Sequence, residues 1–363
     1  MKSILIINWR DILNPEAGGA ETYYHEIFKR IASHGYDVTV LAHRFGDKKE
    51  EMFERIRIIR TGNKFLFNFS TIPWVFKNRK KFDLVIEDLN KLPFFTPLYL
   101  SRPRLHMVMH FFGRAIYRET NFIFASYVYL MEKLIPLIYR KERFIAISKS
   151  TKKEIVEGGV SGEKIHIVEP GIDTSYFYQS VPKSAPPVLA YVGRLMKYKN
   201  VQFLIRALPV LKKSVPDVRL EVAGGGDYLD DLKKIAQDAG VAESVTFLGR
   251  ISEEEKRDLL SRATLFVNPS SKEGWGINNI EANLCGTVSL SSDVPGLRDS
   301  VQDGITGLLY EPENIDDYCR KASSVLLDSA FREKLQNNAM SWAKSLDWDI
   351  IAGRMETILK ENY

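Results

Sequence analysis

Two glutamates, Glu273 and Glu281, bracket a glycine-rich stretch whose residue types suit the binding of a sugar and a nucleotide. Residues 271–286 read SKEGWGINNIEANLCG, so two glycines follow the first carboxylate, and the second lies about one turn into a predicted helix. Carboxylates accept hydrogen bonds from paired hydroxyls, and backbone N–H groups at a helix N-terminus hold hydroxyls or phosphate. We therefore expect one carboxylate to reach a sugar and the other a ribose diol. Helix capping is the plain alternative for Glu273.

Two cations follow a predicted strand in the stretch YVGRLMKYKN, residues 191–200. Arg194 supplies a planar fork of donors and Lys199 a compact charge, a pairing that suits the two phosphates of a nucleotide diphosphate. Lys197 is the alternative to Lys199, and ordinary surface charges are the alternative to both. The position predicts an anion site at the carboxyl edge of a sheet.

A glycine pair, Gly18 and Gly19, stands between the first predicted strand and a helix. Glycines let backbone N–H groups approach an anion at the positive end of a helix. The chain has no G-x-G-x-x-G motif here, which argues against a nicotinamide or flavin site. A plain turn remains the alternative.

Short apolar runs alternate with amphipathic stretches along the chain, the pattern of βαβ units. In the first half, strands are predicted at residues 3–8, 37–41, 56–59, 83–87, 105–110, 143–147 and 165–168. Residues 180–187 hold three prolines and predict a linker. After it, strands are predicted at residues 188–192, 218–223, 245–248, 265–268 and 288–291. We predict two doubly wound α/β domains, 1–180 and 181–345, facing each other across a cleft, with ligands outside the carboxyl ends of the strands.

Composition narrows the class of protein. Apolar residues make up 45% and charged residues 27% of the chain, as in a folded globular protein rather than a disordered one. The two cysteines, Cys285 and Cys319, fit neither a disulfide scaffold nor zinc spacing. The first residues, MKSILIINWRD, have too short an apolar run for a signal peptide. Polar residues and a proline interrupt the apolar stretch 122–139, so no membrane span is expected. These features predict a cytoplasmic protein.

The first half carries an excess of positive charge. Residues 51–150 hold 18 Lys and Arg against 8 Asp and Glu. Residues 65–76, FLFNFSTIPWVF, are rich in aromatics and are followed by Lys77, Arg79, Lys80 and Lys81. This combination predicts reversible docking on an anionic membrane surface, at the inner face of the cytoplasmic membrane. The alternative is that the aromatics are core and the cations a solvated face. Nucleic-acid binding is not expected, because no recognition module is apparent.

The order of the segments resembles the retaining glycosyltransferases of family 4, which have the GT-B fold. The E-x7-E spacing of Glu273 and Glu281 is the most specific part of the resemblance, which extends over almost the whole chain. The supporting segments are Gly18-Gly19 with Glu21, Pro170-Gly-Ile-Asp173, Arg194 with Lys199, Ala223-Gly-Gly-Gly226 and Gly304-Ile-Thr-Gly307.

The resemblance implies roles for individual residues. Gly19, Arg194 and Lys199 would bind the donor diphosphate. Glu273 would contact the transferred sugar, and Glu281 the ribose. The remaining implied donor-side residues are His110 near the sugar, Arg250 and Ile251 near the base, and Gly18, Gly274, Trp275, Gly276 and Ile277. The resemblance also implies that the last helix, residues 346–363, crosses back to the first domain, with Trp342, Trp348 and Ile351 as its buried face.

Two patterns suggest metal ligands, but each has a plainer interpretation. His106 and His110 would lie about 13 Å apart on a strand, at about 3.3 Å per residue, too far to share an ion. Asp347 and Asp349 have D-x-D spacing but sit at the start of a helix, where acidic residues act as caps. We expect no metal site and no cofactor.

We therefore predict a retaining, metal-independent hexosyltransferase that uses a nucleotide diphosphate sugar as donor substrate. The acceptor would be a cell-surface glycan or a lipid-linked molecule. By analogy with the family, the nucleoside diphosphate would leave and the acceptor would attack on the same face of the sugar. This course would retain the anomeric configuration without a protein nucleophile. A nucleotide-sugar epimerase of the same fold and a non-catalytic module that binds sugar nucleotides are the alternatives. The nucleotide, sugar and linkage stay open.

Overall fold

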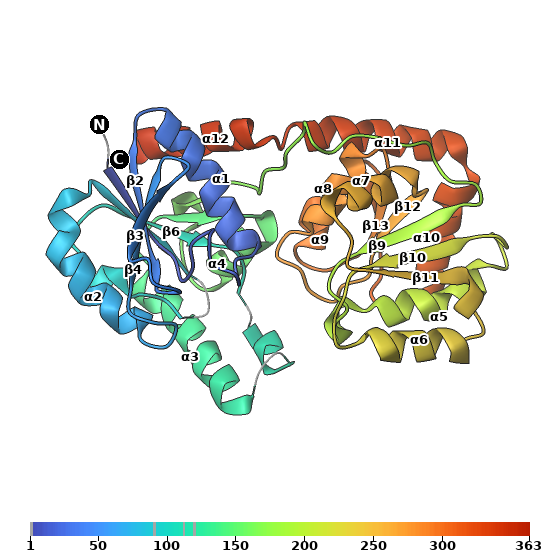
Figure 1. Cartoon of the computed structure of the whole chain (residues 1–363), viewed down its shortest axis with the longest axis horizontal. Helices are drawn as coiled ribbons and strands as arrows, with labels where there is room; N and C mark the ends of the chain where they lie inside the picture. Colours follow the sequence, from blue (N-terminus) through green and yellow to red (C-terminus); the bar gives the residue numbers. More distant parts are fainter. Residues whose placement is uncertain (1–2, 90–91, 112, 119–120) are drawn as a thin grey trace. The chain divides into compact units, whose positions relative to one another are not determined.

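The computed structural model describes residues 3–89, 92–111, 113–118 and 121–363. The chain divides into two compact units, Met1–Gly171 with Trp348–Tyr363, and Ile172–Asp347 (Figure 1). The chain passes from the first unit to the second between Gly171 and Ile172, ahead of the proline-rich stretch where the sequence suggested a linker. The boundary precedes the prolines because Ile172 and Ser180 already form hydrogen bonds with residues of the second unit. The Ile172 N–H donates to the Leu346 carbonyl (2.9 Å), and the Ser180 hydroxyl donates to Asp258 (2.6 Å).

The first unit is built on one twisted sheet with the strand order β3-β4-β2-β1-β5-β6-β7-β8. The strands are β1 Ser3–Ile7, β2 Asp37–His43, β3 Glu50–Phe53, β4 Ile56–Thr61, β5 Leu84–Asp88, β6 Arg104–Val108, β7 Phe144–Ala146 and β8 Ile165–Ile167. All neighbours are parallel except β3, which runs antiparallel to β4. The sequence did not predict β3, because this edge strand has no buried residue and therefore no apolar run.

Helices cover the first sheet and bring the end of the chain back to it. They are α1 Gly19–Ser33, α2 Phe67–Asn78, α3 Phe122–Ile138, α4 Lys149–Glu157 and α12 Trp348–Asn362. Trp348 packs edge-on against Tyr23 of α1, with ring centroids 6.4 Å apart, and Ile351 is fully buried. A Cβ on Gly171 would lie 2.3 Å from the Trp348 ring, so only glycine fits there. The predicted return of the last helix is confirmed.

One part of that prediction was wrong. Trp342 lies in α11 (Ser329–Lys344), within the second unit, and is only partly buried. The helical pattern continues through residues 329–362 with a short break near Leu346, so periodicity alone did not separate α11 from α12. In the described residues, no helix combines the length and apolar composition that a membrane span needs.

The second unit repeats the architecture with the strand order β11-β10-β9-β12-β13-β14, all parallel. The strands are β9 Val188–Val192, β10 Arg219–Ala223, β11 Val245–Gly249, β12 Leu265–Asn268, β13 Val288–Ser292 and β14 Gly307–Tyr310. The helices, with α11, are α5 Val201–Leu211, α6 Leu229–Asp238, α7 Glu253–Arg262, α8 Ile277–Leu284, α9 Leu297–Ser300 and α10 Ile315–Leu327. The sequence missed β14, a four-residue edge strand too short to show a period.

The strand order of the second unit reverses between β9 and β12. In open α/β sheets, ligands bind outside the carboxyl ends of the strands at such a reversal. The loops that leave β9 and β12 carry Arg194 and Lys199 on one side and Glu273 on the other. The sheet of the second unit thus brings the most specific sequence motifs to one edge.

Candidate active site

Glu273 is held by two side chains at the carboxyl edge of the second sheet. Its Oε1 forms an ion pair with Lys199 Nζ and accepts a hydrogen bond from the Ser270 hydroxyl (2.8 Å). Lys199 and Glu273 are mostly buried, with side chains 15% and 18% exposed. The Lys199–Glu273 ion pair thus connects the loop after β9 to the loop after β12. The sequence placed both residues in the site but did not predict that they pair.

Lys199, not Lys197, faces this carboxylate. The two lysines share a short 3-10 helix, and Lys197 is exposed. Arg194 is exposed, and its guanidinium lies 3.4 Å from the Tyr198 hydroxyl. Within the described part of the chain Arg194 has no ion-pair partner, which leaves most of its N–H donors open to an anion.

Glycines set the course of the loop that carries Glu273. Gly296 has a φ of +85°, and a Cβ there would lie 2.2 Å from the Glu273 carbonyl oxygen. Gly276 has a φ of +79°, and a Cβ there would lie 2.7 Å from the Leu297 side chain. Gly296 was missed by the sequence analysis, although its position after Pro295 is a turn signal.

The beginning of α8 is tied to the end of β9. The Asn278 side-chain amide donates to the Val192 carbonyl (2.7 Å), so the helix starts at the reversal point. Trp275, just before the helix, is buried, and its indole N–H has no hydrogen-bond partner among the described residues. Ile277 at the first helical position is exposed. The Asn279 N–H donates to the Gly276 carbonyl (2.9 Å), which closes the first turn of the helix.

Glu281 is buried on α8 and pairs with a lysine that the sequence analysis did not single out. Lys256 Nζ on α7 lies 3.0 Å from Glu281 Oε1 and 2.9 Å from Glu253. In the described structure Oε2 of Glu281 has no partner. Burial raises the pKa of Glu281, and the charge of Lys256 opposes that rise. Burial acts to lower the pKa of Lys256, but the two carboxylates outweigh it and raise that pKa.

Arg250 and Ile251 follow β11 and lie beside a triple glycine. A Cβ on Gly225 would meet Nε of Arg250 at 3.3 Å. Cβ atoms on the flanking glycines, Gly224 and Gly226, would lie 1.8 Å from the Gly193 carbonyl oxygen and 2.3 Å from that of Leu195. These glycines are therefore required for the loops after β9 and β10 to touch. They bring the segments of Arg194 and Arg250 together along the same edge.

The glycine pair at the start of α1 lies in the first unit. The Gly18 N–H donates to Glu21 Oε2 (2.7 Å), and its φ is −140°. A Cβ on Gly19 would meet no described atom within 4 Å, and neither glycine has a positive φ. A tight turn therefore does not explain the pair. The open space beside Gly19 leaves the helix N-terminus accessible.

His110 lies two residues beyond β6, not on the strand as the sequence suggested, because the strand ends at Val108. His106 is buried instead between two carboxylates, with Nδ1 and Nε2 each 3.3 Å from Glu87 and Glu142 respectively. Burial lowers the pKa of His106, but the two carboxylates outweigh it and raise that pKa.

The D-x-D pair splits between the two units. Asp347 immediately precedes α12 and accepts a hydrogen bond from Thr174 (2.5 Å), whereas Asp349 forms an ion pair with Arg30 of α1. Across the described residues, no group of three or more His, Cys, Asp or Glu side chains has the geometry of a metal site.

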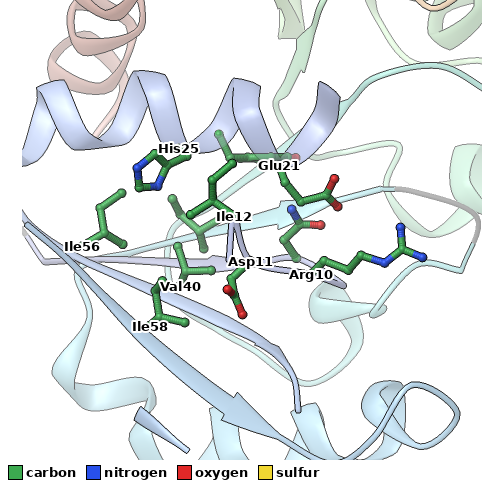
Figure 2. A pocket seen from close by; sticks show the side chains of 11 residues that line it. Arg10, Asp11, Ile12, Glu21, His25, Val40, Ile56 and Ile58 are labelled. Carbon is green, nitrogen blue, oxygen red and sulfur yellow. The ribbon is translucent and has the colours of Figure 1, made fainter. Parts of the chain in front are cut away.

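A pocket in the first unit lies between α1 and strands β1, β2 and β4 (Figure 2). Glu21 and His25 of α1 face Val40, Ile56 and Ile58 across it. Its free volume of about 20 Å³ has room for about one water molecule. This pocket is too small for a sugar nucleotide, and we assign it no ligand.

Comparison with known proteins gives two adjacent family matches. Residues 17–176 match the model described as Glycosyltransferase Family 4, and residues 174–342 match that of Glycosyl transferases group 1. A GDP-mannose-dependent alpha-(1-6)-phosphatidylinositol monomannoside mannosyltransferase from Mycolicibacterium smegmatis is 29% identical over 231 residues, 59% of this chain and 60% of the relative. The match spans only 53% to 60% of the length of the curated relatives that rank first.

Solved structures share the fold over the whole chain. Sucrose-phosphate synthase from Thermosynechococcus elongatus has a TM-score of 0.78 at 22% identity, covering 99% of both chains. Anabaena HepE in complex with UDP and glucose has a TM-score of 0.75 at 17% identity, covering 99% of this chain and all of HepE. The GT-B fold predicted from the sequence is confirmed.

Proposed function

Because the chain belongs to glycosyltransferase family 4, we propose that it transfers a hexose from a nucleotide diphosphate sugar to an acceptor, with retention of anomeric configuration. The observation that carries this proposal is the cluster of Glu273, Lys199 and Ser270 where the strand order reverses. The buried carboxylate of Glu281 lies about one turn along the helix that starts there.

In this proposal, Glu273 accepts hydrogen bonds from hydroxyls of the transferred sugar and Glu281 from the ribose diol. A carboxylate has about four acceptor positions, so Glu273 can bind Lys199, Ser270 and a sugar hydroxyl together. The lysine ammonium has three donors. One binds Glu273 in the structure, and the others are proposed to contact the donor diphosphate together with the open guanidinium of Arg194.

Charge develops on the diphosphate as the glycosidic bond breaks. Two cations and preorganised N–H groups stabilise such charge most strongly when they need no reorganisation. We assign this role to Arg194, Lys199 and the N–H groups of Gly274, Trp275, Gly276 and Ile277, with Gly18 and Gly19 at the start of α1. With charge stabilisation supplied by side chains, the reaction is proposed not to need a metal ion as Lewis acid.

Further assignments complete the proposal. Arg250 and Ile251 are proposed to meet the base and His110 the donor sugar. Retention is proposed to proceed with departure of the nucleoside diphosphate and attack of the acceptor on one face of the sugar. Glu273 is not assigned as a nucleophile, because its Oε1 already binds Lys199 and Ser270. The acceptor is proposed to be a cell-surface glycan or, as the name of the Mycolicibacterium smegmatis relative suggests, a lipid-linked molecule. We place the reaction at the inner face of the cytoplasmic membrane.

The test starts from the donor. Calorimetric titration with UDP, GDP, ADP and their hexose conjugates should identify one nucleotide, and incubation with that conjugate alone should give slow hydrolysis. An epimerase would rearrange the sugar, and a binding module would leave it intact. NMR of the product should show the anomeric configuration of the donor. Inversion, or strict dependence on Mg²⁺ or Mn²⁺ in chelator titrations, would contradict the proposed mechanism.

A further inference from the structure

The α2 segment exposes one apolar face and buries the other. Phe65, in the turn before the helix, is 86% exposed, and Phe69 and Phe76 within it are 72% and 54% exposed. The spacing of seven residues places Phe69 and Phe76 on one side of the helix. Phe67 and Val75, on the opposite side, are buried in the core of the first unit. The aromatics of this segment are therefore divided between core and surface.

Helix α3 has the same division. Ile123, Leu130 and Leu137 recur at intervals of seven and are 82%, 57% and 75% exposed. Val128 and Ile135 on the other side are buried. Three large aliphatic side chains on one solvent-facing line are unusual for a monomer surface, where such residues occur singly.

The two helices border the same stretch of chain, residues 92–98. The Asn68 side chain of α2 donates to the Pro93 carbonyl (3.1 Å), and Leu92 packs against the cluster that holds Val128 of α3. Leu98, at the end of the stretch, is 68% exposed. We call the exposed apolar side chains of α2 and α3, with Leu98, the α2–α3 surface (both helices are labelled in Figure 1).

Cations flank the α2–α3 surface. Lys77, Lys80 and Lys81 are exposed at the end of α2. Lys133 on α3 and Arg140 just after it are exposed as well. Within the described part of the chain, none of these five side chains forms an ion pair. Glu132, which precedes Lys133 in the sequence, accepts a hydrogen bond from the Gly113 N–H (2.8 Å).

We propose that the α2–α3 surface docks on an anionic lipid bilayer, with its apolar side chains in the headgroup boundary and its cations on the phosphates. Amphipathic helices bind bilayers through this combination of apolar area and positive charge. A second copy of the chain is a poorer occupant, because its own cations would face those of the first. The inference deepens the proposed function, on which it rests for a lipid-linked acceptor, and adds α3, whose exposed face the sequence did not reveal.

Cosedimentation of the full chain with vesicles tests the proposal. Vesicles of phosphatidylcholine with phosphatidylglycerol should bind the protein at about 0.01 M salt, and affinity should fall at least about tenfold at about 1 M salt or on phosphatidylcholine alone. Replacing Lys77, Lys80 and Lys81 by Gln should remove most of the difference between the two lipids.

The apolar contribution is tested with one triple Gln variant for each helix. Phe65, Phe69 and Phe76 are changed in the first variant, and Ile123, Leu130 and Leu137 in the second. Each variant should bind anionic vesicles at least about tenfold more weakly, a loss of about 1.4 kcal/mol. Leu327→Gln, at a 65% exposed leucine of the second unit, is the matched control and should bind like the wild type. Unchanged melting temperatures should show that all variants fold, since every altered side chain is exposed.

Three outcomes would overturn the inference. They are no binding to anionic vesicles at low salt, undiminished binding by both triple variants, and a wild-type dimer in sedimentation velocity that the α3 variant dissolves. The last result would assign the surface to a second copy. Nucleotide titration of the α2–α3 surface variants distinguishes the docking proposal from the proposed reaction, because these variants should bind the donor with unchanged affinity. Loss of vesicle binding with intact donor binding would leave the proposed reaction standing.

Discussion

Removing the charge of Lys256 should make nucleotide affinity more sensitive to acid. The lysine lies 3.0 Å from Glu281 and is the main group that opposes the rise of the pKa of Glu281 caused by burial. In Lys256→Met the pKa of Glu281 should therefore rise further. A protonated carboxyl group keeps fewer acceptor positions for the ribose diol than a carboxylate does.

The magnitude follows from the loss of charge-assisted hydrogen bonds. Such bonds contribute about 1.5–3 kcal/mol each, so the affinity for a nucleotide should fall by about 10-fold to 150-fold once Glu281 is protonated. In the wild type, nucleotide affinity should fall as pH drops through the raised pKa of Glu281. In the variant, this fall should begin at a higher pH.

Folding stability should depend on pH in a related way. A carboxyl group whose pKa is higher in the folded than in the unfolded protein stabilises the fold below its unfolded pKa, and that contribution is lost as pH rises through the folded pKa. The free energy of unfolding of Lys256→Met should therefore fall relative to wild type as pH rises.

Calorimetric titration with the preferred nucleoside diphosphate between about pH 5 and pH 9, above the ordinary glutamate pKa of about 4.3, measures the binding effect. Urea denaturation over the same range measures the stability effect. Lys233→Met is the control, because that lysine is half-exposed on α6 and lies in an i,i+3 pair at 3.9 Å. If Lys256→Met had the same pH profile of affinity as wild type, Lys256 would not govern the ionisation of Glu281, or Glu281 would not contact the ribose.

Three further predictions concern the loop of Glu273. Glu273→Gln should lower transfer at least about tenfold while nucleotide affinity changes little, since the carboxylate is assigned to the sugar; a rate near that of wild type would remove this role. Lys199→Met should lower turnover by about 10² to 10³, by analogy with the loss of an oxyanion donor, whereas Lys197→Met in the same short helix should leave it unchanged; equal effects would contradict the assignment of Lys199. Gly296→Ala should lower turnover by displacing the Glu273 backbone, which a Cβ would approach to 2.2 Å, while Gly304→Ala, with a φ of +72° and no described atom within 4 Å of a Cβ, should cost stability only. Turnover and melting temperature measured together distinguish a displaced loop from simple strain.

The central strands of both sheets were predictable because parallel strands buried on both faces have continuous apolar runs. The missed strands, β3 and β14, lie at sheet edges and are only four residues long. The E-x7-E pattern identified the loop of Glu273 for a related reason. Binding and catalytic residues are concentrated on loops that a rigid scaffold positions, and this segment lies between a buried strand and a helix.

Partners across the fold were not predictable from the same patterns. Lys199 pairs with Glu273 because the strand order brings β9 beside β12, and periodicity shows where strands lie but not which strands are neighbours. Lys256 has the sequence context of any cation on an amphipathic helix. Its distinction is that it reaches a buried carboxylate on α8, which depends on how α7 packs.

The glycines of the second unit explain how the proposed donor site can be rigid while it is built from loops. Gly224 and Gly226 allow backbone contact between the loops after β9 and β10, and Gly296 allows contact with the loop after β12. Each contact is between the backbones of two loops, so it does not depend on the identity of side chains elsewhere. Charged groups fixed in this way before the reaction stabilise developing charge without reorganisation. In the proposed function, the specificity for the base can then vary through side chains such as Arg250 while the loops that hold Glu273 and Lys199 stay in place.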